Sequence, residues 1–179
     1  MLRKIKEVSK KKMAAVGLGI TAAVVGLGFF TDYAVGKSEE LKVAKKEEAY
    51  LEEVRQTLDE LHAVTGELVE IDETVSYYPN MIFDPDFRDD VSECLSDLND
   101  IIKKVRAMKA PKVHKEVQEN FEYSMNAYEY VTVNYGTAIS VPQFGEKRRV
   151  YDSWYDGNHY VEETINHMED PNYEGSPNY

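Results

Sequence analysis

The chain has almost no cysteine, because Cys94 is the only one among its 179 residues. A single thiol cannot form a disulfide within the chain, so packing has to stabilise whatever folds. Cys94 also lies far from the amino terminus and cannot serve there as a site for lipid attachment. It falls on an apolar helical row described below, and we expect it to be a small buried filler.

Motifs for catalysis and for metal binding are also missing. The sequence has no G-x-S-x-G motif, no H-E-x-x-H motif, no paired-cysteine zinc site and no EF-hand loop. Glu163 and His167 are four residues apart and could share a metal, but an ion pair on a helix surface is the simpler interpretation. We therefore predict no catalytic residue, no metal site, no cofactor and no enzymatic activity.

Positive charge is scarce beyond the amino terminus. Residues 1–12 carry a net charge of +5, and the total of −12 leaves −17 for the rest of the chain. An acidic surface of this kind repels nucleic acid and anionic lipid headgroups, so we predict neither as a partner. It keeps a domain soluble and attracts cations or basic proteins.

One long apolar run is present, at residues 13–30, where Thr21 is the only polar side chain. As a helix this run is about 27 Å long, close to the ~30 Å thickness of a bilayer core. Basic residues precede it, and the positive-inside rule then places the amino terminus in the cytoplasm. We predict a basic cytoplasmic tail at 1–12, a transmembrane anchor at 13–30 and a juxtamembrane linker at 31–37.

A cleaved secretory signal is the alternative for this region, because a small-x-small triplet ends at Gly36. An apolar core of eighteen residues is long for a signal peptide, so we favour a retained single-pass anchor; either way the rest of the chain is extracytoplasmic. The small residues Ala15, Gly19 and Ala23 form a row that could support weak homo-oligomers through this helix. Gly17, Gly19 and Ala22 match the spacing of a dinucleotide-binding motif. That motif requires a strand before it, and a lysine-rich tail stands there, so we predict no nucleotide site.

The remaining sequence predicts an all-α fold, an antiparallel four-helix bundle at residues 38–169. Prolines separate the helices, which we expect at 38–77, from 84 to about 108, at 111–140 and from 142 onward. Asp156, Gly157 and Asn158 resemble a turn and predict a kink or break in the fourth helix. Residues 170–179 have two prolines and little to bury, and we expect them to be disordered.

Apolar side chains recur three and four residues apart in each helix and predict the core. In the first helix they form two adjacent rows, a wide stripe that suits a globular bundle. The rows are Leu51, Val54, Leu58, Leu61, Thr65, Leu68, Asp72 and Val75, with Tyr50, Thr57, Val64, Ile71 and Tyr78; then Phe87, Val91, Cys94, Leu98, Ile101, Val105 and Met108; then Val117, Phe121, Ser124, Tyr128, Val131, Tyr135 and Ala138; and last Phe144, Tyr151, Trp154, Val161, Ile165 and Met168.

Aromatic residues are concentrated in the second half of the chain, where twelve of the twenty lie from Phe121 onward. Tyr123, Tyr130, Tyr155 and Tyr160 lie off the predicted core rows, so their side chains should reach the surface or the rim. Surface tyrosine contributes a large contact area with few rotatable bonds, and is common at contact sites. We predict these four tyrosines as partner-binding residues.

Together these features predict a membrane-anchored, extracytoplasmic helical bundle at the cell surface, acting as a non-enzymatic binding module for a protein or cell-envelope component. The alternative is an extracytoplasmic helper that binds a small ligand or a metal, secreted after cleavage near Gly36.

The topology can be measured directly with a tag at the carboxyl terminus. Because residues 13–30 can span and the basic residues precede them, protease added to intact spheroplasts should remove the tag. A protected tag would contradict the orientation. Release of the whole domain to the medium without protease would favour the cleaved signal.

Overall fold

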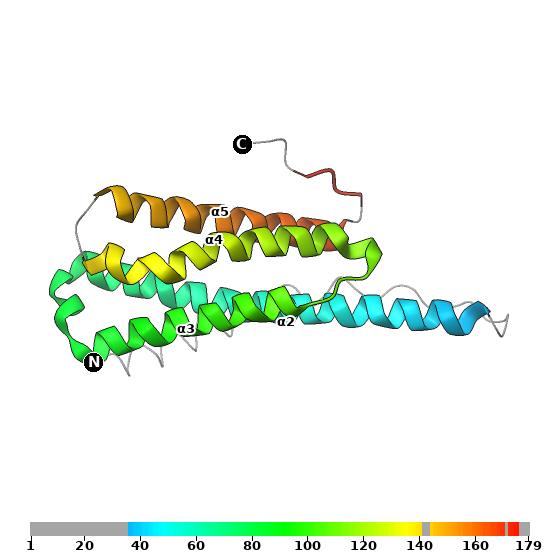
Figure 1. Ribbon diagram of the computed structural model, residues 1–179, viewed down its shortest axis with the longest axis horizontal. Coiled ribbons are helices and arrows are strands. Elements are labelled where there is room, and N and C mark those ends of the chain that lie inside the picture. Colours follow the sequence, from blue (N-terminus) through cyan, green and yellow to red (C-terminus); the bar gives the residue numbers. More distant parts are fainter. Residues whose placement is uncertain (1–35, 141–143, 171, 176–179) are drawn as a thin grey trace. The chain divides into compact units, whose positions relative to one another are not determined.

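The computed structural model describes residues 36–140, 144–170 and 172–175, so the predicted tail and membrane anchor lie outside the described residues. Four α-helices follow one another: α2 (Gly36–Tyr77), α3 (Pro85–Ala107), α4 (Lys115–Ser140) and α5 (Phe144–Glu169). Two short 3₁₀ helices, η1 (Pro79–Phe83) and η2 (Lys112–His114), lie in the connections. Within these ranges there is no strand, and successive helices run in opposite directions (Figure 1). The predicted all-α bundle is confirmed.

None of the helices in the described part of the chain combines the length and the apolar character that a membrane span requires.

Helix α3 begins where its sequence predicts, because Asp84 caps it. The Asp84 Oδ1 atom accepts hydrogen bonds from the backbone N–H groups of Asp86 at 2.9 Å and Phe87 at 3.4 Å. Pro85 occupies the first helical position, where a missing N–H group has no consequence. At the other end Met108 adopts an extended backbone, and the chain turns away before Pro111.

The predicted core rows of α3 and α4 are buried without exception, whereas α2 fully buries only part of each of its two rows. Tyr50, Thr57 and Ile71 are buried beside Val54, Leu61, Leu68 and Val75, which confirms the wide stripe. The other members of the two rows are only partly buried: Leu51, Leu58, Val64, Thr65 and Asp72. Tyr78 is 68% exposed, because the helix has already ended at Tyr77.

The predicted row of α5 is partly wrong. The buried positions there are Val150, Trp154, Gly157, Glu163 and Thr164, with Val161 and Met168 packed beside them, whereas Ile165 is 38% exposed. Glycine and threonine carry no apolar signal, so Gly157 and Thr164 are invisible to a search for hydrophobic spacing. Tyr151 is half-buried, and the side chain of Phe144 lies outside the described residues.

The predicted kink at Gly157 is also wrong, because α5 runs through it without a break. A Cβ atom at Gly157 would lie only 3.0 Å from two carbon atoms of the Tyr128 ring. Tyr128 is itself buried, and its hydroxyl donates to Asn158 Oδ1 at 2.6 Å. Glycine is therefore required by the close approach of α4 to α5 and not by a turn.

A buried polar chain connects three helices. The Tyr50 hydroxyl of α2 donates to Gln118 Oε1 of α4 at 3.0 Å, and Gln118 Nε2 donates to the Val105 carbonyl of α3 at 3.1 Å. Burial raises the pKa of Tyr50, with smaller contributions from nearby carboxylates. Among the described residues, no buried side-chain nitrogen or oxygen atom lacks a hydrogen-bond partner. These bonds fix the register of the helices, because an unpaired buried polar group is costly.

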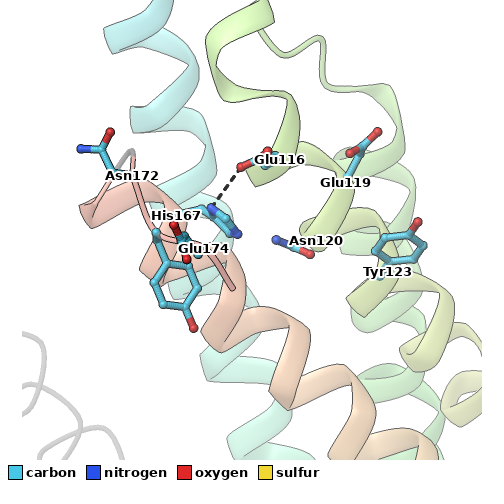
Figure 2. A pocket seen from close by; sticks show the side chains of 8 residues that line it. Glu116, Glu119, Asn120, Tyr123, His167, Asn172 and Glu174 are labelled. Atoms are coloured by element: carbon cyan, nitrogen blue, oxygen red, sulfur yellow. Dashed lines mark ion pairs between the residues drawn. The ribbon is translucent and has the colours of Figure 1, made fainter. Parts of the chain in front are cut away.

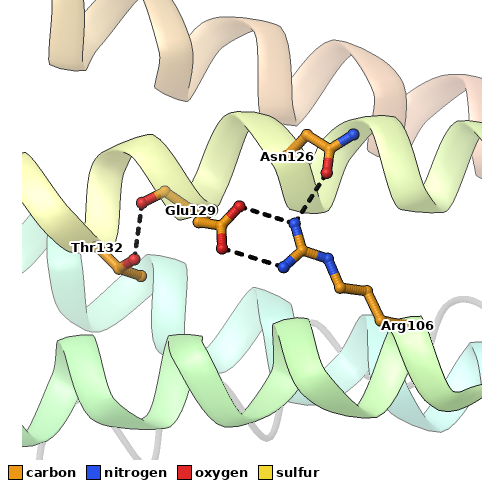
Figure 3. Close-up of polar contacts among 4 residues, drawn as sticks. All are labelled: Arg106, Asn126, Glu129 and Thr132. Atoms are coloured by element: carbon orange, nitrogen blue, oxygen red, sulfur yellow. Dashed lines mark hydrogen bonds and ion pairs between the residues drawn. The ribbon is translucent and has the colours of Figure 1, made fainter.

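A second polar connection lies on the surface, between the last turn of α3 and the middle of α4 (Figure 3). The Arg106 guanidinium donates to both carboxylate oxygens of Glu129, at 3.0 and 2.8 Å, and to Asn126 Oδ1 at 2.9 Å. The hydrogen bonds between these two side chains lower the pKa of Glu129 and raise the pKa of Arg106. The paired geometry is more specific than a single contact, although its exposure to solvent limits its strength.

Replacing Gly157 by alanine tests the close α4–α5 contact. The added methyl group would press on the buried Tyr128 ring, so we expect the free energy of unfolding to fall by about 1–3 kcal/mol in urea denaturation. Gly136→Ala is the matched control, because a Cβ atom at that position meets nothing within 4 Å. Alanine is the better helix former, so this change should stabilise the protein by up to ~1 kcal/mol. Equal effects of the two changes would refute the proposed role of Gly157.

Candidate functional site

The first turns of α4, the end of α5 and the residues just after it surround a cleft of about 570 Å³ (Figure 2). We call it the α4–α5 cleft. Its lining residues are Glu116, Glu119, Asn120, Tyr123, His167, Asn172, Tyr173 and Glu174.

The α4 wall of the cleft follows from helical spacing. Glu116, Glu119, Asn120 and Tyr123 are separated by three, one and three residues, which places them on one face of the helix. The buried row of the same helix, with Val117 and Phe121, points into the core and leaves this face at the surface. The polar wall therefore has a fixed position relative to the bundle.

The opposite wall depends on a turn after α5. The side chain of Asp170 accepts a hydrogen bond from the Asn172 N–H group at 2.9 Å, and the Tyr173 N–H group donates to the Asp170 carbonyl at 3.0 Å. This turn brings Tyr173 back onto α5, where its hydroxyl donates to Glu163 Oε1 at 3.1 Å. Disorder was predicted for residues 170–179, but this turn and the Tyr173 contacts hold part of that segment against the bundle. Residues 171 and 176–179 lie outside the described part of the chain.

His167 lies at the base of the cleft, with its side chain only 10% exposed. Its Nδ1 atom is 3.4 Å from Glu116 Oε2, and the two side chains point toward each other in Figure 2. The His167 ring meets the Tyr173 ring edge to face at 4.9 Å between centroids. The sequence suggested a surface ion pair of His167 with Glu163. That interpretation is wrong in placing Glu163 at the surface, because Glu163 is 6% exposed.

The electrostatic character of the cleft is negative. Three of its lining residues are glutamates, and none of the eight is lysine or arginine. Lys115 pairs with Glu119 at 2.7 Å, and Glu116 faces His167 at 3.4 Å, so among the described residues Glu174 is the glutamate of the cleft without an ion pair. Tyr123 and Tyr173 add two aromatic rings, whose faces attract cations. The combination of carboxylates and aromatic rings suits a positively charged ligand.

The structure separates the four tyrosines predicted as partner-binding residues. Tyr123 is 53% exposed, lines the cleft, and has its ring 5.4 Å from that of Tyr160 on α5. Tyr130 is half-buried against the core, and its hydroxyl donates to Glu146 Oε1 at 2.9 Å. Tyr155 is 73% exposed and does not line the cleft. Only Tyr123 and Tyr160 are thus brought together.

Most residues of the cleft were missed by sequence reasoning. Glu116, Glu119 and Asn120 look like an ordinary solvated helix face, and nothing in their spacing identifies the helix opposite. Tyr173 belongs to a segment rich in proline and polar residues, a composition typical of a disordered tail. One sequence signal pointed to the α4 wall of the cleft: helical spacing places Tyr123 on the same face as Glu116, Glu119 and Asn120.

Other groups with chemical potential are engaged in packing. Cys94 is buried, and its thiol donates to the Val64 carbonyl at 3.6 Å. Burial, with smaller contributions from the Glu67 and Asp97 carboxylates, raises the pKa of Cys94 to about 12. The described residues contain no group of three or more acidic, histidine or cysteine side chains arranged to hold a metal ion.

Compared with protein-family models, with curated proteins and with solved structures, the chain matches none of them. Its function has to be argued from the site itself.

The state of Cys94 can be checked by thiol labelling. Because the native state keeps the thiol buried and protonated, an aromatic disulfide reagent at pH 8 should react far more slowly with native protein than with protein in urea. The stability that the protonated thiol contributes is complete below about pH 9 and is lost as the pH rises toward 12. Rapid labelling of the native protein would contradict the burial of this residue.

Proposed function

We propose that the chain is a membrane-anchored, extracytoplasmic binding module, without enzymatic activity, that captures a positively charged segment of a protein or other cell-envelope component in the α4–α5 cleft. The anchor and its orientation rest on the apolar run at residues 13–30 and on the basic residues before it.

The observation that carries the proposal is the composition of the cleft. Glu116, Glu119 and Glu174 provide negative charge, Tyr123 and Tyr173 provide aromatic faces, and no lysine or arginine lines the same space. A lysine or arginine side chain over a tyrosine face gains about 0.5–2 kcal/mol, and a carboxylate beside it adds to the attraction. The acidic surface of the whole domain would also speed the approach of a basic partner.

The fold supports a rigid site. The two helices that carry Glu116 and His167 pack closely where Tyr128 meets Gly157, and the Tyr173 hydroxyl donates to the buried Glu163, which attaches the segment after α5 to the bundle. A preformed cleft lowers the entropic cost of binding, because few side chains have to be ordered when the partner arrives.

The second candidate is a helper that binds a small organic cation. It is supported by the volume of the cleft, about 570 Å³, which lies within the range of small-molecule sites. The two candidates share one binding chemistry and differ only in whether the cation belongs to a polymer.

The proposal can be tested with a pentalysine peptide as the probe and the full-length protein in detergent or nanodiscs. Isothermal titration should show binding that weakens as salt is raised, and the double change Glu116→Gln with Tyr123→Ala should lower affinity at least ten-fold. Free lysine or a diamine that binds as tightly as the peptide would favour the small-ligand candidate.

Two matched controls separate the cleft from general charge attraction. Glu48→Gln with Glu70→Gln removes two exposed carboxylates from α2, and Tyr155→Ala removes an exposed tyrosine from α5 outside the cleft. Both controls should bind pentalysine nearly as well as the unaltered protein. Equal weakening in the controls, or no binding at all, would overturn the assignment of the cleft.

A further inference from the structure

The turn between α2 and α3 carries three large aromatic side chains that the fold leaves in solvent. Tyr77, Tyr78 and Phe83 are 78%, 68% and 75% exposed, and we call these three residues the aromatic tip. Aromatic side chains bury about 150–250 Å² each in an interior, so the tip offers on the order of 400 Å² of mostly apolar surface. All three lie within one stretch of seven residues, whereas apolar residues scattered singly over a surface need no explanation.

Folding of the turn does not require these rings. The Met81 N–H group donates to the Tyr78 carbonyl at 2.9 Å, and the Asp84 N–H group donates to the Met81 carbonyl at 3.0 Å. Met81 and Ile82 pack against the core and fix the turn to the bundle. The aromatic tip is thus held on an ordered backbone, where rigid tyrosine and phenylalanine side chains make effective anchors for a partner.

The charges around the tip limit what can cover it. Five acidic residues lie between positions 73 and 90, against Arg88 alone. A second copy of the chain would bring the same acidic surface against itself, since a two-fold contact pairs identical patches. Anionic lipid headgroups would be repelled for the same reason. A partner with basic residues around an apolar pocket meets both requirements.

We propose that the aromatic tip is a second docking surface, which inserts into an apolar pocket rimmed by lysine or arginine on a protein partner. It is separate from the α4–α5 cleft. The tip lies before the first residue of α3, and the cleft is lined by α4, which follows the last residue of α3. Since α3 has 23 residues and is about 35 Å long, the two surfaces lie near opposite ends of this helix.

Photo-crosslinking of the full chain in intact cells tests this proposal. A benzophenone-bearing phenylalanine replaces Tyr78 in one variant and Val133, which is 73% exposed on α4, in the matched control. We expect one protein adduct from position 78 whose crosslinked peptide, identified by mass spectrometry, is apolar with flanking lysine or arginine. Adding Phe83→Ser should lower its yield about ten-fold or more.

Each other outcome counts against the proposal. An adduct of twice the mass of the chain would identify a second copy as the occupant, and an adduct with lipid would identify the membrane. Equal yields at positions 78 and 133, or an adduct insensitive to Phe83→Ser, would show that the tip is not a specific surface. Glu116→Gln with Tyr123→Ala should leave the adduct unchanged, so failure of the cleft and failure of the tip remain distinguishable.

Discussion

The close contact between Tyr128 and Gly157 sets the geometry on which much of the bundle depends. A ring that lies 3.0 Å from the position of a missing Cβ atom brings α4 nearer to α5 than any larger residue would permit. The backbones of these two helices approach each other over more of their length than those of any other described pair. Glu116 and His167 of the cleft belong to the same two helices, so their relative position follows from how α4 and α5 pack.

Polar groups inside the bundle complement this packing. A single cysteine forms no disulfide within the chain, so the register of the helices depends on packing and on hydrogen bonds. The Tyr50–Gln118–Val105 chain opposes a shift of that register, because its donors and acceptors would be left unpaired. At the other end of the bundle the Tyr151 hydroxyl donates to Asp72 and connects α5 to α2. Apolar rows thus provide most of the stability, and these bonds select one arrangement.

The two surfaces proposed for binding differ in chemistry as well as in place. The cleft combines carboxylates with tyrosine rings in a hollow, whereas the aromatic tip projects three side chains from an ordered turn. Both are surrounded by acidic residues, and both therefore suit basic partners. Because α3 separates them along its length, each surface can be altered without changing the other.

The sequence by itself determined the helices and most of the core. Proline positions, the Asp84 cap and the three-and-four spacing of α3 and α4 act locally, so they can be read without knowing what packs against what. The tertiary structure alone decided the meaning of Gly157, Thr164 and Ile165, because a small residue is buried or an isoleucine exposed according to the helix opposite. It also decided the cleft. Glu116 and His167 are far apart in the sequence and 3.4 Å apart in space, and no local pattern specifies which helices become neighbours.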